Sequence, residues 1–157
     1  MPTISPEISI KISGLLKSMG KVSEQSISEA KNFISSSDFG ASIYFTGTVR
    51  SQNNNKSVIG ITYDSHDALV NKSFKEIYNE ADQKLNIKDK SVYIEHAKGY
   101  LNLGEISIII AVGCKHREQA YVLSRYIIEE IKKRSPIWKK EHYSNKESSW
   151  LKGNPIH

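Results

Sequence analysis

Residues 106–134 read ISIIIAVGCKHREQAYVLSRYIIEEIKKR, and this stretch decides the fold. Residues 106–113 are apolar on both faces of an extended chain, which predicts a central strand. From about residue 117 to residue 134, apolar side chains recur at helical spacing, and cations fill the last turn, where they suit the helix dipole. Pro136 then stops the helix. A buried strand followed by an amphipathic helix predicts a chain that mixes both kinds of element.

The other segments are predicted from the same two periodicities. Apolar spacing predicts helices over about 23–36 and 70–85, the first with a capping box formed by Ser26 and Glu29. Strand 41–50 is expected to pair with strand 58–65 across a polar loop, and strand 137–143 to lie at a sheet edge. The fold class predicted by this order is α+β, with helices packed on the sheet. The remaining expected strands span residues 8–12 and 92–97, with a turn region at 99–104.

Length and composition narrow the class of protein. A chain of 157 residues, 38% hydrophobic and 25% charged, is expected to form one domain over residues 1–157. The most apolar stretch, 106–112, is too short to span a membrane, so we expect a soluble protein of the cytoplasm. The single cysteine, Cys114, excludes an intramolecular disulfide and a thiol relay within the chain. The five histidines lack metal-ligand spacing, so no metal site and no cofactor are expected.

The net charge of +5 favours an anionic partner, and the cations gather in one segment. Residues 132–140 read KKRSPIWKK, with five cations in nine positions and no acid. One interpretation is a solvated helix end followed by a charged edge strand. The other is functional: Lys132 and Lys139 lie on either side of a proline turn and can converge on one anionic ligand. Crowded lysines exchange protons readily because neighbouring cations lower their pKa.

Two further signals concern anion binding. His116 and Arg117 stand where the apolar strand meets the long helix, and unsatisfied N–H groups at a helix start attract anions. A helix cap or an ordinary surface position is the alternative interpretation. Arg50 stands at the end of the strand that contains Thr48 and Val49, and it is the third candidate for an anion-binding residue. The alternative interpretation is an ordinary surface residue at a strand terminus.

Together these motifs resemble a known family. The residues that carry the resemblance are FTGTVR at 45–50, Gly104-Glu105, His116-Arg117 and Lys132 followed by PIWKKE at 136–141. In order and spacing they are similar to the large, catalytic subunit of molybdopterin synthase, the MoaE family. The similarity spans residues 40 to 151. One departure lies at residues 96–99, which read HAKG where the family commonly has His-Arg-x-Gly.

The resemblance implies an α/β hammerhead-like fold and a homodimer that carries a small ubiquitin-like subunit at each end, giving a heterotetramer. It implies a sulfurtransferase of molybdenum cofactor biosynthesis. In that reaction the small subunit's C-terminal Gly-Gly thiocarboxylate donates sulfur to cyclic pyranopterin monophosphate, and two transfers form the dithiolene of molybdopterin. Lys132 and Lys139 match the family's catalytic lysines. The positions that match its substrate contacts are Thr48, Val49, Arg50, His116, Arg117, Lys132, Lys139, Lys140 and Glu141.

Two other classes of function remain open from the residues alone. A basic nucleic-acid-binding module would spread its cations along a groove, whereas here they are concentrated at 132–140, so we expect no nucleic acid and no membrane partner. A non-catalytic scaffold that docks a ubiquitin-like protein would not need both lysines. The sequence therefore favours an enzyme whose sulfur is brought by a partner, since the chain has no thiol relay.

Overall fold

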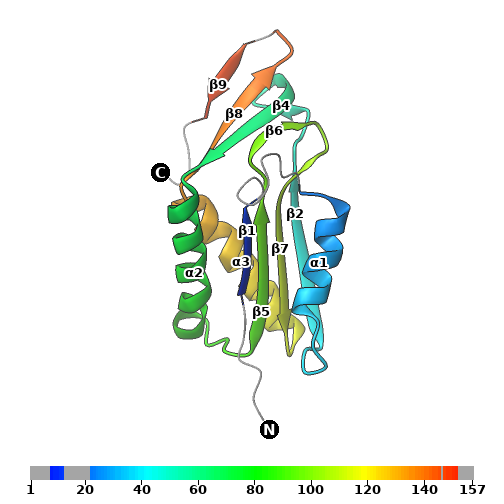
Figure 1. Cartoon of the computed structure of the whole chain (residues 1–157), viewed down its shortest axis with the longest axis vertical. Coiled ribbons are helices and arrows are strands. Elements are labelled where there is room, and N and C mark those ends of the chain that lie inside the picture. Colours follow the sequence, from blue (N-terminus) through cyan, green and yellow to red (C-terminus); the bar gives the residue numbers. More distant parts are fainter. Residues whose placement is uncertain (1–7, 13–21, 146, 152–157) are drawn as a thin grey trace.

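A computed structural model of the chain describes residues 8–12, 22–145 and 147–151, and it shows two sheets and three helices in that part of the chain (Figure 1). The α+β class is confirmed. The elements are β1 (Ile8–Ile12), α1 (Glu24–Ile34), β2 (Ala41–Thr48), β3 (Gln52–Asn53), β4 (Lys56–Ser65), α2 (Asp67–Lys84), β5 (Lys90–His96), β6 (Gly99–Asn102), β7 (Ile106–Cys114), α3 (Arg117–Arg134), β8 (Ile137–Tyr143) and β9 (Ser148–Trp150).

The first sheet has the strand order β1-β5-β7-β2. Strand β1 runs parallel to β5, and β7 is antiparallel to both of its neighbours. The prediction that residues 106–113 form a central strand is confirmed, because β7 lies between β5 and β2 and is buried from residue 107 onward. Helix α3 begins at Arg117 and ends at Arg134, as the apolar spacing predicted.

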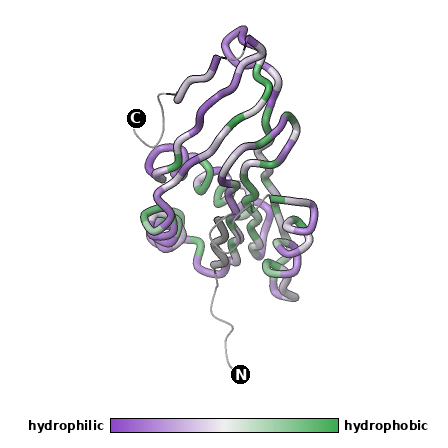
Figure 2. The backbone as a smooth tube through the Cα atoms, turned by 45° about the horizontal axis from the view of Figure 1, so that its top comes forward, coloured by the Kyte–Doolittle hydropathy of each residue, from purple (hydrophilic) through white to green (hydrophobic). Residues whose placement is uncertain are grey.

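Alternate residues of β7 build two hydrophobic cores, one on each face of this sheet. Ile108, Ile110 and Val112 pack with residues of α2 and α3. Ile109 and Ala111 point the other way and pack with residues of α1. In Figure 2 green, hydrophobic residues lie along these central strands, whereas α2 carries both green and purple residues. The apolar character of β7 on both faces follows from this three-layer arrangement.

The second sheet has the order β3-β4-β8-β9, and β6 also pairs with β4. It corrects two predictions. Strand β2 pairs with β7 and not with β4, because β2 closes the edge of the first sheet while β4 leaves for the second. Strand β8 is not an edge strand, because β9 covers its other side.

Local turn chemistry explains the remaining differences. The expected polar loop at 51–56 is a tight hairpin in which Asn54 and Asn55 adopt positive φ angles of 50° and 63°, a conformation that asparagine tolerates. The capping box of α1 uses Ser23 and Ser26, one turn earlier than predicted. Strand β2 ends at Thr48, two residues before Arg50.

No helix in the described part of the chain is long and apolar enough to cross a membrane.

Candidate active site

A cavity of about 590 Å³ opens where the two sheets meet the end of α3. Strands β2, β4, β5, β7 and β8 all contribute to its wall, so the cavity depends on the packing of both sheets. Polar and charged side chains line it together with a few apolar ones. The lining residues are Phe45, Gly47, Thr48, Arg50, Tyr63, His96, Ser107, Ile108, Ile128, Ile131, Lys132, Ser135, Ile137, Lys139 and Leu151.

Lys132 and Lys139 both line this cavity, as the sequence predicted. Lys132 comes from the last turn of α3 and Lys139 from β8. The turn between them is fixed by backbone hydrogen bonds: the Ser135 N–H donates to Ile131 O at 3.0 Å, and the His66 N–H donates to Pro136 O at 3.2 Å. A defined turn therefore brings two ammonium groups to one cavity.

The electrostatics of the cavity act on Lys139. Its pKa is lowered, first because the surrounding protein partly desolvates the ammonium group, and then because Lys132 and Arg50 are nearby cations. The carboxylate of Glu141 opposes this effect and raises the pKa. Lys139 is still accessible to solvent through the cavity. A lysine in this state gives up and regains a proton more readily than a lysine on an open surface.

The side chains of residues 48–50 lie in two places, some in the cavity wall and one in a hydrophobic core. Thr48 and Arg50 line the cavity. Val49 points into the second hydrophobic core and is 4% exposed. Its N–H donates to Glu105 O at 3.0 Å, and its carbonyl accepts from the Gly104 N–H at 2.8 Å. Val49 therefore anchors the strand end that presents Arg50.

His116 and Arg117 are not near this cavity within one chain. They stand exposed at the start of α3, whereas Lys132 lies in its last turn. Fifteen residues separate Arg117 from Lys132, which at about 1.5 Å of rise per residue is about 22 Å. That distance exceeds the combined reach of an arginine and a lysine side chain. The chain by itself forms a site with Arg50 and the two lysines but without His116 and Arg117.

Lys140 and Glu141 follow Lys139 on β8 but do not line the cavity. The Lys140 ammonium group lies 5.6 Å from the centre of the Trp150 ring. Glu141 is 3% exposed. Its carboxylate accepts hydrogen bonds from the Asn53 amide at 3.0 Å and from the Tyr143 hydroxyl at 3.0 Å. Glu141 therefore ties the β3–β4 hairpin to β8 and acts on Lys139 through its charge.

Besides Ser135 at the end of α3, three neutral polar side chains in the cavity wall are not indicated by the sequence: Tyr63, His96 and Ser107. They lie on three separate strands, and each fits an ordinary strand pattern, so no local spacing marks them. The one available signal is a histidine at the end of a strand that is otherwise mostly apolar. Burial lowers the pKa of His96 to about 4, although its hydrogen bond to Ala97 O raises it.

The departure at residues 96–99 also has a structural account. Ala97, where the family commonly has arginine, is 2% exposed and belongs to the second core. The ammonium group of Lys98 binds the Asp67 carboxylate at 3.1 Å and does not line the cavity. Among the residues that line the cavity, none near His96 supplies a cation in place of the arginine that the family commonly has at position 97.

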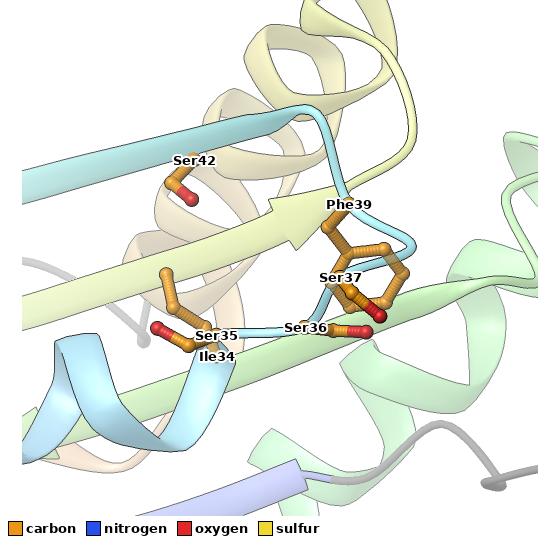
Figure 3. A pocket seen from close by; sticks show the side chains of 6 residues that line it. All are labelled: Ile34, Ser35, Ser36, Ser37, Phe39 and Ser42. Carbon is orange, nitrogen blue, oxygen red and sulfur yellow. The ribbon is translucent and has the colours of Figure 1, made fainter.

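A second hollow, of about 390 Å³, lies at the end of α1 (Figure 3). Its lining contains no charged or titratable side chain. Hydroxyl groups of consecutive serines and the Phe39 ring face it. The lining residues are Ile34, Ser35, Ser36, Ser37, Phe39 and Ser42. The cationic cavity is therefore the better candidate for chemistry.

The fold and the cavity define an α+β domain with a cationic pocket in which the pKa of one lysine, Lys139, is lowered. The model of the family described as MoaE protein matches residues 21–134. The molybdopterin synthase catalytic subunit of Synechococcus elongatus is 39% identical over 128 residues, which are 82% of this chain and 77% of that protein. The chain belongs to the MoaE family.

Two solved structures are similar in fold and sequence. The crystal structure of molybdopterin synthase from Staphylococcus aureus superposes with a TM-score of 0.74 at 27% identity, covering 96% of this chain and 98% of that one. The protein–protein complex of subunits 1 and 2 of molybdopterin-converting factor from Helicobacter pylori gives a TM-score of 0.61 at 26% identity, covering 94% and 91%.

Proposed function

We propose that this chain is the catalytic subunit of a molybdopterin synthase, a sulfurtransferase of molybdenum cofactor biosynthesis. The observation that carries the proposal is the convergence of Lys132, Lys139 and Arg50 on one cavity, in a chain that belongs to the MoaE family. The substrate is cyclic pyranopterin monophosphate. The sulfur donor is the C-terminal thiocarboxylate of a small ubiquitin-like subunit, and the similarity to one subunit of the Helicobacter pylori complex supports a small partner.

The charges of the cavity suit these two ligands. A cyclic phosphate and a thiocarboxylate are both anions, and three cations in a partly desolvated cavity stabilise them and the negative charge that develops during transfer. Lys139 carries out acid–base work on the pterin side chain, because its lowered pKa suits proton exchange. Lys132, on the helix end, receives the thiocarboxylate. Arg50 holds the phosphate.

His116 and Arg117 enter this scheme from a second copy of the chain. The homodimer implied by the family provides the means, since a symmetric dimer can place the start of one α3 beside the end of the other. A site built in this way contains Arg50, Lys132 and Lys139 of one protomer and His116 and Arg117 of the other. The 22 Å separation along α3, about 15 residues at 1.5 Å each, supports the two-chain arrangement over a one-chain site.

The test is a turnover assay. The purified chain is mixed with thiocarboxylated small subunit and cyclic pyranopterin monophosphate, and the dithiolene product is measured. We expect Lys132→Ala and Lys139→Ala each to lower turnover by about 10²-fold or more. Lys133→Ala is the matched control, because Lys133 neighbours Lys132, is exposed and pairs with Glu130 at 3.5 Å outside the cavity.

Two results would contradict the proposal. Wild-type protein that binds the small subunit but forms no dithiolene would be a docking scaffold and not the synthase. Lysine variants that keep near wild-type turnover would remove Lys132 and Lys139 from the reaction. Lys140→Ala is also informative, because Lys140 lies against Trp150 and outside the cavity. We expect turnover of that variant to stay within about threefold of wild type, because Lys140 lies outside the cavity; a larger loss would support the match of Lys140 to a substrate contact of the family.

A further inference from the structure

Arg50 lies on a short segment between two anchors. On one side of it, Val49 is buried in the second core. On the other side the chain enters the β3–β4 hairpin, where the Val58 N–H donates to Ser51 O at 2.8 Å. Arg50 itself is exposed and lines the cavity. The position of its guanidinium group therefore depends on where the core and the hairpin hold the segment.

One side chain of the hairpin, that of Asn53, docks it on strand β8. The Asn53 amide nitrogen lies 3.0 Å from each oxygen of the Glu141 carboxylate. A carboxylate only accepts hydrogen bonds, so the amide is the donor. Glu141 is buried and Asn53 is half-buried, so solvent competes little for this contact. A hydrogen bond to a charged group is roughly twice as strong as one between neutral groups, which makes this contact an effective tie.

Glu141 is itself held in place by the strands around it. The Tyr143 hydroxyl donates to its carboxylate at 3.0 Å, and the Ser149 hydroxyl of β9 lies 3.0 Å from the Tyr143 hydroxyl. Glu141 and Lys139 are two residues apart on β8, so their side chains lie on the same face of the strand. A hydrogen bond from Asn53 to Glu141 therefore fixes the hairpin relative to the strand that presents Lys139.

The spacing of Arg50 and Lys139 has to be set by such a tie, because the two cations come from different sheets. Strand β2, which precedes Arg50, belongs to the first sheet, and β8 belongs to the second. In the described part of the chain, the side-chain hydrogen bond that joins residues 50–55 to β8 is the one from Asn53 to Glu141. Two cations bind one anionic ligand well only when their separation matches that ligand.

We propose that Asn53 is a positioning residue of the sulfur-transfer reaction, which holds Arg50 in place by binding Glu141 on β8. The inference rests on the proposed function, in which Arg50 holds the cyclic phosphate. It gives Glu141 an indirect role, since this side chain does not line the cavity and is bonded to Asn53. Loss of the Asn53–Glu141 contact releases the hairpin from β8, and substrate affinity falls because Arg50 no longer has a fixed position.

The first experiment exchanges the two groups of this pair in the turnover assay. In Asn53→Asp two carboxylates face each other, so we expect KM for cyclic pyranopterin monophosphate to rise about tenfold. Adding Glu141→Gln places an amide against the new carboxylate and restores a hydrogen bond of reversed polarity. We expect KM of the double variant to return to within about threefold of wild type. A double variant whose KM is as high as that of Asn53→Asp would overturn the inference.

The second experiment asks whether Asn53 acts through Arg50. Asn53→Leu keeps the volume of the side chain but removes the amide, and we expect it to raise KM about tenfold and to weaken inhibition by inorganic phosphate in parallel. In an Arg50→Ala background the same substitution should change KM by less than about twofold, because the group that Asn53 positions is already gone. Losses that add in full in both backgrounds would show a merely structural role and overturn the inference.

The matched control is Gln52→Leu. Gln52 precedes Asn53 on β3 and is exposed, and successive side chains of a strand point to opposite faces. We expect its KM and its inhibition by phosphate to equal those of wild type. Equal losses in Gln52→Leu and Asn53→Leu would overturn the specific role of Asn53.

The failure of this inference is distinguishable from the failure of the proposed function. Wild-type protein that forms no dithiolene would defeat the proposed function. Hydrogen exchange tests the tie in either case, because the Val58 N–H is bonded to Ser51 O across the hairpin. We expect this N–H to exchange faster in Asn53→Leu than in wild type and Gln52→Leu. Equal exchange in all three proteins would mean that Asn53 does not hold the hairpin.

Discussion

The length of helix α3 leads to a quantitative prediction about whether one active site uses residues of two chains. If His116 acts on a cavity of the other protomer, a dimer that pairs one Lys132→Ala chain with one His116→Ala chain has one intact site and one doubly damaged site. We expect about half of the wild-type specific activity from this mixed dimer, because sites in a symmetric dimer are equivalent. A homodimer of either single variant has no intact site and should be nearly inactive.

The assay uses two affinity tags and tandem purification, so that only mixed dimers are measured. Its control pairs a wild-type chain with a chain that carries both substitutions. In that dimer each cavity lacks one group, so we expect almost no activity if the site spans two chains. A site within one chain gives the opposite pattern: the control keeps half of the activity and the mixed dimer of single variants has none. That pattern would refute the reasoning from the 22 Å separation, about 15 residues at 1.5 Å each.

Three further predictions concern pH, acid stability and the shape of the cavity. The alkaline limb of the pH–rate profile should lie below the usual pKa range of lysine, because the pKa of Lys139 is lowered. Glu141→Gln should move this limb to a still lower pH, because it removes a carboxylate that raises the pKa of Lys139. A limb within the usual lysine range would contradict the role of Lys139. Hydrogen bonds from Arg134 lower the pKa of Glu80 from 4.5 to about 2, so this carboxylate stabilises the fold above pH 4.5 and its contribution disappears as the pH falls toward 2. Denaturant titrations should therefore show Glu80→Gln to be less stable than wild type by about 1 to 2 kcal/mol at pH 6, a value reduced for partial exposure, and most of this difference should be lost at pH 2. A difference that is the same at both pH values would contradict this role of the ionised carboxylate. A Cβ atom on Gly47 would stand 3.0 Å from Ile108 Cγ2, which is closer than ordinary contact. Gly47→Ala should therefore lower the free energy of unfolding by about 1 to 2 kcal/mol. A free energy of unfolding equal to that of wild type would mean that the Ile108 side chain moves aside at no cost.

The elements that could be predicted are those whose burial is one-sided or complete. Helix α3 matches the sequence prediction because its apolar residues contact a core on one face, and strand β7 matches because both of its faces are buried. Strand partners could not be predicted, since a period of two fixes which side chains face the core but not which strand lies alongside. The pairing of β2 with β7 and the inner position of β8 therefore required the structure. Strand β6 was predicted as a turn because a glycine begins it and another follows it, both with positive φ.

The candidate site shows a similar division. Lys132 and Lys139 could be predicted because they lie close in sequence and are joined by a proline turn, so local geometry brings them together. Arg50 was predicted from its place after a strand and from the family resemblance. Tyr63 and His96 could not be predicted as cavity residues, because only the meeting of two sheets places them side by side.

The single cysteine has a practical consequence. Cys114 is 0% exposed, and burial raises its pKa to about 11, so the folded chain presents no reactive thiol to solvent. A cysteine introduced on the surface is then the sole labelling position in each protomer. Tyr121 is 63% exposed in the second turn of α3, and Tyr121→Cys accepts a spin label there. Pulsed electron resonance on the labelled protein would measure the spacing of the two α3 helices in solution without removing any native residue of the cavity.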